Sequence, residues 1–315
     1  MSRFLHAGVA QLGPIARYES RQKVVARLID LLHQARARRC ELVVFPELAL
    51  TTFFPRWNLQ DPAEIDSFYE AEFPGPQTQA LFDTAAKHGI GFEIGYAELA
   101  TEGGRTHRYN SALLVDRNSA IVGKYRKVHL PGYSTVQDTP GQHLEKRYFE
   151  VGNFGFPVWN AFGGALGMCI CNDRRWPETY RVMALQGVEL ICIGYNTPLG
   201  AGDPPELDAL APFHNHLVMQ AGAYQNCTWV LAAAKTGFEE GFNLLGQSCI
   251  IAPSGEIVAM ASTREDELIS FRCNLDFARP YRDDIFNFAA HRRIEHYGLI
   301  TERTAAPASN KLASF

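Results

Sequence analysis

The chain has 315 residues, of which 46% are apolar and 20% are charged, proportions typical of a globular protein. The formal net charge of −4 provides no basic field, so we expect no nucleic-acid partner. No segment approaches the roughly 18 consecutive apolar residues of a membrane helix. His6, Gly8 and Gln11 also interrupt the first apolar run, unlike in a signal peptide. We therefore expect a cytoplasmic protein without membrane attachment, whose seven cysteines are free thiols.

The amino-terminal half alternates amphipathic segments with short apolar runs. Hydrophobic residues between Ser20 and Arg38 recur at helical spacing, whereas Leu42 to Phe45 is a continuous apolar run typical of a buried strand. Gly89 is a natural end for the helix before it. The pattern predicts helices at 20–38 and 77–88 and strands at 4–11, 41–45, 90–99, 109–116 and 121–128.

The carboxyl-terminal half is richer in strands, and Gly163-Gly164 is a two-residue hairpin signal. We expect helices at 177–185 and 213–224 and strands at 156–162, 165–171, 190–195, 228–235, 248–252, 257–261 and 268–275. This is an α/β pattern that two mixed sheets, packed face to face with helices outside, would accommodate. No linker divides the chain, so we expect a single domain over residues 1–303 and a flexible Ala/Ser/Pro-rich tail at 304–315.

Three reactive side chains stand where predicted strands end, namely Glu47, Lys127 and Cys171. Catalytic groups of α/β proteins gather at strand ends. A thiol could attack a substrate there, a carboxylate could take its proton, and an ammonium could stabilise both the thiolate and the developing oxyanion. Lys124 and Arg126 compete with Lys127 for this role, and the local pattern alone does not separate them.

The two cysteines of CICNDRRWPE allow other readings. A redox pair usually has the spacing C-x-x-C at a helix start, whereas Cys169 and Cys171 are spaced C-x-C at a strand end. Nothing completes a metal shell around His214 and His216, so we expect no metal and no cofactor. If the strand stays regular, both sulfurs face one side and could form an inactivating bridge on oxidation.

The segments FPELALT, KYRKVHLPG and CICNDRRWPE resemble the three signature regions of the nitrilase superfamily. Within it, HLEKRYFE, GYNTP, MQAGAYQN and the late IFNF and HYGLI resemble the N-carbamoyl-D-amino acid amidohydrolases, so that the likeness runs from about residue 10 to 300. The resemblance implies a four-layer α-β-β-α sandwich and a carboxyl-terminal arm from about residue 277. It also implies a homo-oligomer, either dimer or tetramer.

The resemblance also assigns roles to residues. Glu47 would be the general base, Lys127 the oxyanion stabiliser and Cys171 the nucleophile, and Glu145 would orient the lysine or the substrate. The implied reaction hydrolyses an N-carbamoyl-D-amino acid to the D-amino acid, carbon dioxide and ammonia through a thioester on the cysteine. A β-ureidopropionase, an aliphatic amidase or a nitrilase would share these residues.

Substrate recognition is expected to depend on Arg174 and Arg175, because a guanidinium binds a carboxylate with two parallel hydrogen bonds. We expect one of them, with Arg175 preferred, to bind substrate and the other to be structural. The resemblance adds the substrate-binding residues Asn196, Thr197 and His143, and His129 is a further candidate. The loops 133–140 and 199–207 depart from the family pattern beside this site, and such loops set specificity on a fixed scaffold.

Overall fold

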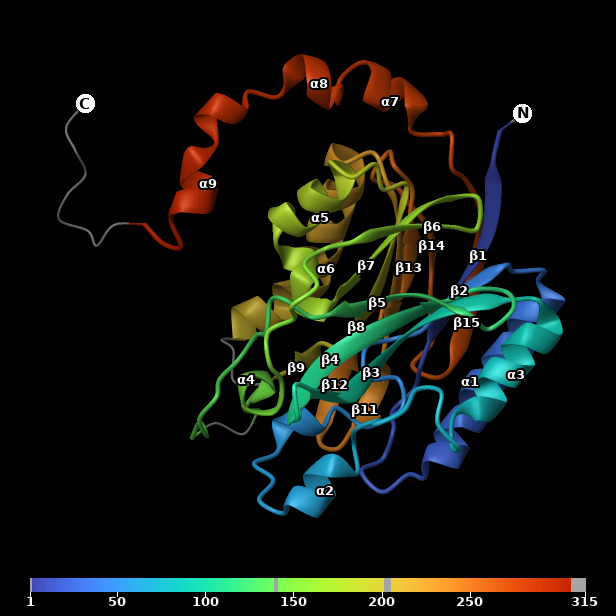
Figure 1. The fold of residues 1–315 in the computed structure, drawn as a ribbon, viewed down its shortest axis with the longest axis vertical. Helices are drawn as coiled ribbons and strands as arrows, with labels where there is room; N and C mark the ends of the chain where they lie inside the picture. The colour runs from blue at the N-terminus through green and yellow to red at the C-terminus, as the bar shows by residue number, and fades with distance from the viewer. Residues whose placement is uncertain (1, 139–140, 201–204, 307–315) are drawn as a thin grey trace. The chain divides into compact units, whose positions relative to one another are not determined.

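The computed structural model describes residues 2–138, 141–200 and 205–306 (Figure 1). It divides into two compact units, with the boundary between Ala278 and Arg279. The first unit carries all the strands of the described chain, in two six-stranded sheets and one three-stranded sheet. Of the tail predicted at 304–315, residues 307–315 lie outside the described residues.

The first six-stranded sheet has the order β15-β1-β2-β3-β4-β5. Its strands are β15 (Glu267–Asn274), β1 (Phe4–Gln11), β2 (Leu42–Val44), β3 (Gly91–Glu102), β4 (Arg105–Val115) and β5 (Ile121–Arg126). Only β1-β2 and β2-β3 are parallel pairs. The helices α1 (Arg21–Ala37) and α3 (Gln79–His88) cover its outer face (Figure 1), and Gly89 ends α3 in the left-handed conformation as predicted.

The second six-stranded sheet has the order β14-β13-β10-β8-β7-β6. Its strands are β14 (Ile257–Met260), β13 (Cys249–Ile251), β10 (Trp229–Ala234), β8 (Leu190–Tyr195), β7 (Gly164–Ile170) and β6 (Val158–Ala161). The helices α5 (Pro177–Ala184) and α6 (Pro205–Gln225) cover its outer face (Figure 1). The inner faces of the two sheets share one apolar core, which confirms the predicted α-β-β-α sandwich.

Smaller elements connect these layers and reach the edge where the predicted site lies. They are β9 (Pro198–Leu199), β11 (Thr236–Glu239), β12 (Phe242–Leu245), η1 (Phe54–Arg56), α2 (Pro62–Asp66), α4 (Glu145–Tyr148) and η2 (Cys171–Arg175). The strands β11, β12 and β9 form the three-stranded sheet, which the sequence pattern did not predict. Helix α6 also begins eight residues before the predicted start at Phe213.

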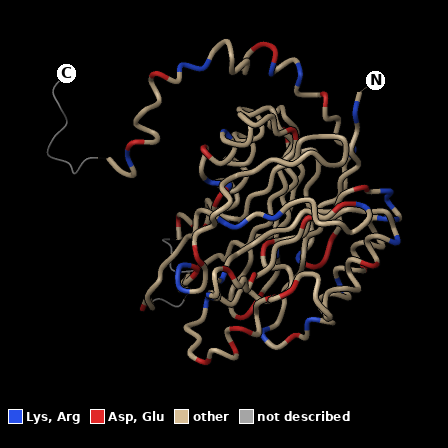
Figure 2. The backbone as a smooth tube through the Cα atoms, in the orientation of Figure 1, with Lys and Arg blue, Asp and Glu red and all other residues tan. Residues whose placement is uncertain are grey.

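The second unit consists of short helical segments. They are α7 (Arg279–Asp283), α8 (Phe288–His291), η3 (Ile294–His296) and α9 (Gly298–Glu302). No helix within the described ranges is both long enough and apolar enough to span a bilayer. Figure 2 shows basic and acidic residues interspersed along the chain rather than separated into two parts of it.

One acidic residue lies in the core between the two sheets, and its carboxylate has no partner among the described residues. Glu93 on β3 pairs with Val44 and Leu114 and is 0% exposed. Neither of its carboxylate oxygens has a hydrogen-bond partner among the described residues. Burial therefore raises the pKa of Glu93 well above its usual value of 4.5.

We expect Glu93→Gln to stabilise the protein more near pH 8 than near pH 5. The folded native protein keeps the Glu93 proton at pH values where the unfolded chain has lost it, so this residue lowers stability as the pH rises above about 4.5. Urea unfolding of both proteins at the two pH values measures the effect, and the gain in stability should be larger near pH 8 than near pH 5. A gain that is the same at both values would contradict the assignment of a protonated Glu93.

Candidate active site

Glu47 is positioned by two glycines, one on each sheet. The chain leaves β2 after Val44, and the following turn passes between Gly95 on β3 and Gly194 on β8. A Cβ atom on Gly95 would lie 2.7 Å from the Cα of Glu47, and one on Gly194 would lie 2.5 Å from its backbone nitrogen. Both positions therefore require glycine, because any side chain would push Glu47 away.

Lys127 directly follows β5 and binds two carboxylates. Its Nζ lies 2.7 Å from Oε1 of Glu47 and 2.6 Å from Oε2 of Glu145, and all three side chains are 0% exposed. Lys124 and Arg126, the competing candidates, both bind Glu98 instead. The structure thus brings Lys127, and neither of its neighbours, to the predicted carboxylates.

The two carboxylates differ in proton affinity. Burial raises the pKa of Glu47, although Lys127 opposes the rise. Burial would also raise the pKa of Glu145, but the charge of Lys127 and a hydrogen bond from His143 lower it. The charges of Glu145 and Glu47 in turn raise the pKa of Lys127 against the effect of burial. A raised pKa on one carboxylate and a lowered pKa on its neighbour is the pattern that the predicted roles of Glu47 as base and Glu145 as orienting carboxylate would require.

Glu47 also keeps one oxygen available. Its Oε1 accepts hydrogen bonds from Lys127 and from Nδ2 of Asn110, at 2.7 and 2.8 Å. Its Oε2 is buried and has no hydrogen-bond partner within the described chain. This oxygen can therefore accept a proton from a neighbouring group without breaking a bond.

Cys171 begins a turn rather than ending a strand, because β7 stops at Ile170 and η2 starts at Cys171. Its φ of 46° lies in the left-handed region, which residues with a Cβ rarely adopt. The Sγ donates to the carbonyl oxygen of Asn196 at 3.3 Å, and the Asn196 side chain donates to the carbonyl of Glu47 at 3.3 Å. Asn196 thus links the thiol to the turn that carries the carboxylate.

The pKa of the Cys171 thiol lies above its usual value. Burial and the charge of Glu47 raise its pKa, and Lys127 and Arg174 offset this only in part. We expected Lys127 to hold the sulfur as a thiolate, but its charge is already balanced by two carboxylates. The thiol would therefore need a proton acceptor to act as a nucleophile, and Glu47 is the predicted one.

A cavity of about 440 Å³ opens at Cys171. Four of the predicted substrate-binding residues line it, namely His143, Arg175, Asn196 and Thr197. Residues of α6 form another part of its wall. The cavity is large enough for a small molecule and has a nucleophile, a cation and amide groups in its wall.

The other two predicted substrate-binding residues, Arg174 and His129, do not line this cavity. Arg174 is 0% exposed, and its guanidinium donates to Asn215, Thr197 and the carbonyl of Cys171. His129 places Nδ1 2.8 Å from a carboxylate oxygen of Asp173, and its ring stacks on Trp176. It lines a neighbouring hollow of about 620 Å³, whereas the lining of the Cys171 cavity does not include it.

Several supporting residues escaped the sequence reasoning. Asn110 holds Glu47, Asn215 holds Arg174, and Asp173 accepts hydrogen bonds from Tyr125, from the backbone of Ile170 and from His129. An aspartate two residues after the nucleophile was a visible signal, since Asp often binds nearby backbone groups at turns. The two asparagines left no signal, because their partners are far away in the sequence.

A second buried ion cluster fixes the segment after Glu47. Lys235 and Arg56 both bind Glu239, and Lys235 also donates to the carbonyl of Thr51 at 2.7 Å. Glu239 accepts from the backbone of Phe53 at 2.8 Å. The Phe53 ring meets the ring of His143 edge-on at 5.0 Å, so this cluster also supports the histidine that binds Glu145.

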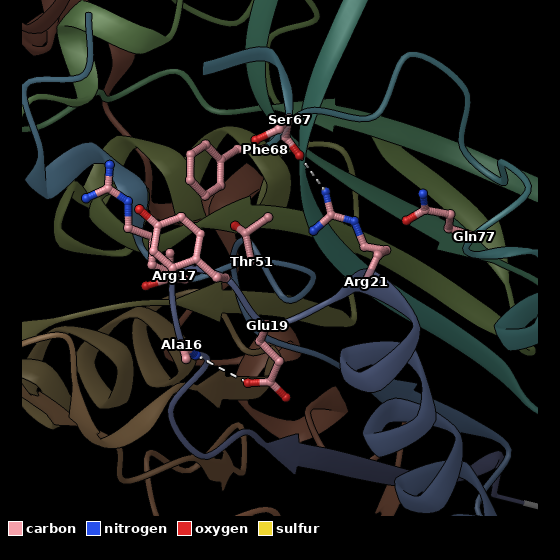
Figure 3. A pocket seen from close by; sticks show the side chains of 10 residues that line it. Ala16, Arg17, Glu19, Arg21, Thr51, Ser67, Phe68 and Gln77 are labelled. Carbon is pink, nitrogen blue, oxygen red and sulfur yellow. Dashed lines mark hydrogen bonds between the residues drawn. The ribbon is translucent and has the colours of Figure 1, made fainter. Parts of the chain in front are cut away.

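Figure 3 shows a different cavity, of about 260 Å³, beside Thr51. Arg17, Arg21 and Glu19 contribute its charged wall, and none of its lining residues is a cysteine. Arg17 is paired with Glu64 and Arg21 with Glu70. Its lining therefore contains no thiol and both of its arginines are paired with carboxylates, so the cavity at Cys171 is the candidate active site.

The sequence profile of a family described as carbon-nitrogen hydrolase matches residues 6–283. The chain belongs to this carbon–nitrogen hydrolase family. It is 30% identical to a nitrilase of Pyrococcus abyssi, over 85% of this chain and 90% of that protein. It is also 30% identical to an N-carbamoylputrescine amidase of Solanum lycopersicum, over 79% of each. The solved structure of a carbon–nitrogen hydrolase from Helicobacter pylori superimposes with a TM-score of 0.81, at 26% identity, over 96% of this chain and 99% of that one.

These comparisons confirm the predicted membership of the nitrilase superfamily and its fold. The narrower likeness to N-carbamoyl-D-amino acid amidohydrolases concerns the substrate, and it enters the proposal below.

Within this carbon–nitrogen hydrolase, Gly194→Ala should lower kcat/KM about 100-fold, because a displacement of about 1 Å at a catalytic group has this effect. The new methyl group would collide with the backbone of Glu47, which cannot move away from Gly95 on the opposite side. Gly13→Ala is the matched control, since its Cβ would meet no atom closer than 3.3 Å. Steady-state kinetics with circular dichroism measures the effect, and unchanged kinetics in Gly194→Ala would refute it.

Proposed function

We propose that this hydrolase converts N-carbamoyl-D-amino acids into D-amino acids, carbon dioxide and ammonia. The observation that carries the proposal is the presence of Arg175 in the wall of the cavity that opens at Cys171. An N-carbamoyl amino acid has a carboxylate near its ureido carbon, and arginine is the side chain best suited to bind it. A simple nitrile has no such group.

The two arginines have different roles in this proposal. Arg174 is buried against Asn215 and Thr197, so it holds the turn of Cys171 in place. Arg175 lines the cavity and binds the substrate carboxylate. This assignment agrees with the preference for Arg175 stated from the sequence, and the D configuration rests on the resemblance of the segments quoted above.

The first chemical step forms a thioester. Sγ of Cys171 attacks the ureido carbon while Oε2 of Glu47 takes the thiol proton. The Nζ of Lys127 has a third hydrogen beyond those given to Glu47 and Glu145, and this hydrogen stabilises the oxyanion. Glu47 then passes the proton to the leaving nitrogen, and ammonia departs.

The second step releases the product. Water attacks the carbamoyl thioester, Glu47 accepts the water proton, and the C–S bond breaks. The sulfur recovers its proton, and the carbamate product loses carbon dioxide to give the free amino acid. Glu145 remains ionised throughout, so that Lys127 keeps its charge.

One observation favours a second candidate. Asp208 also lines the cavity and would attract a cationic substrate, such as the one named for the tomato relative, N-carbamoylputrescine. The Asp208 carboxylate accepts a hydrogen bond from the backbone nitrogen of Gly200 at 2.9 Å, which weakens its attraction for a cationic ligand. β-Ureidopropionase, amidase and nitrilase activities are the remaining alternatives within the family.

Arg175→Ala should lower kcat/KM for an N-carbamoyl-D-amino acid about 100-fold, chiefly through KM, because two charge-assisted hydrogen bonds are lost. The rate on an uncharged amide should not change. Arg264→Ala, an exposed arginine outside the cavity lining, is the control.

The test measures ammonia from N-carbamoyl-D- and L-amino acids, N-carbamoyl-β-alanine, N-carbamoylputrescine, an amide and a nitrile. Turnover of the D-amino acid derivatives above all others is expected. If no N-carbamoyl amino acid reacts, the proposal fails while membership of the family stands.

We also propose a homo-oligomer, a dimer or a tetramer. The outer sides of α5 and α6 expose apolar side chains, namely Val182, Leu185, Leu210, Phe213 and Leu217. A surface of this kind favours association. Light scattering measures the mass in solution, and the mass of one chain would contradict the proposal.

A further inference from the structure

Four residues of α6 form one stripe that faces the Cys171 cavity. Leu207, Ala211, His214 and Val218 follow one another at intervals of four, three and four residues, the spacing of a single helix face. Leu207 is 48% exposed, and Ala211 and Val218 are partly exposed. This stripe therefore presents apolar surface that a ligand in the cavity would cover.

The rotation of α6 is fixed by contacts on the adjoining face. Oδ1 of Asn215 accepts from Arg174 at 2.8 Å, and Met219 is fully buried in the core. Gly222 lies against the ring of Tyr180, where a Cβ atom would come within 2.5 Å. Ala211 is one helical turn before Asn215, so it is held on the side of the helix that carries the Arg174 contact.

The rest of the cavity wall accounts for the polar parts of the proposed substrate. Cys171 meets the ureido carbon, and Arg175 meets the carboxylate. The remaining substituent on the substrate α-carbon is the amino-acid side chain. The aliphatic groups of the α6 stripe form the largest apolar part of the wall left to receive it, beside Pro131 and Pro198.

We propose that the α6 stripe is the side-chain subsite and that Ala211 sets the size of the side chain that the enzyme accepts. This inference rests on the function proposed above and deepens it. Among the stripe residues Ala211 is the smallest, and it stands between Leu207 and Val218. The missing bulk at position 211 leaves the space that a substrate side chain occupies.

Charge in this wall restricts the subsite further. The Asp208 carboxylate lines the same cavity, and Arg175 is engaged by the substrate carboxylate. A negatively charged side chain would lie beside the Asp208 carboxylate, which would repel it. Side chains that are longer than a methyl group and carry no negative charge are therefore the class that the subsite selects.

The experiment compares kcat/KM for N-carbamoyl-D-alanine, N-carbamoyl-D-methionine and N-carbamoyl-D-aspartate. In the native enzyme the methionine derivative should exceed the alanine derivative about 10-fold, from the burial of additional methylene groups. The aspartate derivative should be the poorest. Ala211→Leu should lower the value for the methionine derivative about 30-fold and that for the alanine derivative by less than about 3-fold.

Ala209→Leu is the matched control, because Ala209 is exposed on the same helix and does not line the cavity. It should leave the ratio between the substrates unchanged, and retained turnover of the alanine derivative shows that each variant is folded. Equal values for the alanine and methionine derivatives in the native enzyme would overturn the subsite alone. So would an equal loss on both substrates in Ala211→Leu, or the same shift in Ala209→Leu. If no N-carbamoyl amino acid is hydrolysed, this inference falls together with the proposed function.

Discussion

Cys171→Ala should lower kcat/KM at least about 10⁴-fold, because removal of a nucleophile leaves only binding and electrostatic stabilisation. Cys171 is the cysteine in the lining of the candidate cavity, and its Sγ has Glu47 and Lys127 as electrostatic neighbours. Initial rates of ammonia release over a range of substrate concentrations measure the loss. Mass spectrometry should also detect no acyl-enzyme in this variant, whereas under the proposed mechanism it should detect a carbamoyl thioester on the native enzyme during turnover.

Cys169→Ala is the matched control for this prediction. Cys169 is fully buried on β7, and its pKa is raised well above 9.0 chiefly by burial, so it serves as a small apolar residue. We expect nearly native kinetics and a stability loss of about 1 kcal/mol. More than about 1% residual activity in Cys171→Ala would reject the assignment of the nucleophile.

The predicted oxidative bridge between Cys169 and Cys171 assumed that the strand stays regular through Cys171, and the structure does not meet this assumption. Strand alternation would place both sulfurs on one side only if the strand continued through Cys171. The strand ends at Ile170, and Cys171 adopts a left-handed φ at the start of η2. Asp173 was a local signal of this break, because it accepts a hydrogen bond from the backbone of Ile170, but its bond to Tyr125 on the opposite sheet could not be read from a local pattern.

The sequence predicted the long periodic elements well, since their patterns arise from burial on one face. Strand β1 and helix α1 are examples, with bounds within one residue of the prediction. The hairpin of β11 and β12 was missed because Glu239 gave its sequence a polar character. That glutamate is buried against Lys235 and Arg56, partners that no local window contains.

Helix α6 was predicted too short for a different reason. Pro212 lacks a backbone donor and normally ends a helix, so the pattern placed the start after it. The structure accommodates Pro212 within the helix and begins the helix at Pro205. The two turns missed in this way contain Leu207 and Ala211, which explains why the sequence suggested no side-chain subsite.

Lys127 illustrates the limit for the site itself. Three basic residues stand at positions 124, 126 and 127, and only the resemblance to a family selected the third. Their different roles arise from partners that the fold supplies. Glu98 forms ion pairs with Lys124 and Arg126. Lys127 instead binds Glu47, which lies 80 residues away in the sequence.

Lys127→Met should lower kcat/KM about 10³-fold or more, since the donor to the oxyanion is lost. It should also destabilise the protein by about 3–5 kcal/mol near neutral pH, because Glu47 and Glu145 would be left as buried carboxylates without their cation. Lys124→Met is the matched control. Lys124 is partly exposed, and its partner Glu98 keeps Arg126 and Ser111, so activity should not change and stability should fall by less than about 1 kcal/mol.

The pH dependence of this loss separates an electrostatic cause from poor packing. In the native protein the pKa of Glu145 is below its usual value and that of Lys127 is above its own. In Lys127→Met the folded pKa of Glu145 rises above the unfolded value and that of Glu47, already raised in the native protein, rises further, so the variant loses stability as the pH rises through about 4.5. Urea unfolding near pH 5 and near pH 8 should therefore show a smaller difference from the native protein at the lower pH. A stability difference independent of pH would show that Lys127 does not serve as the counter-charge of the two glutamates.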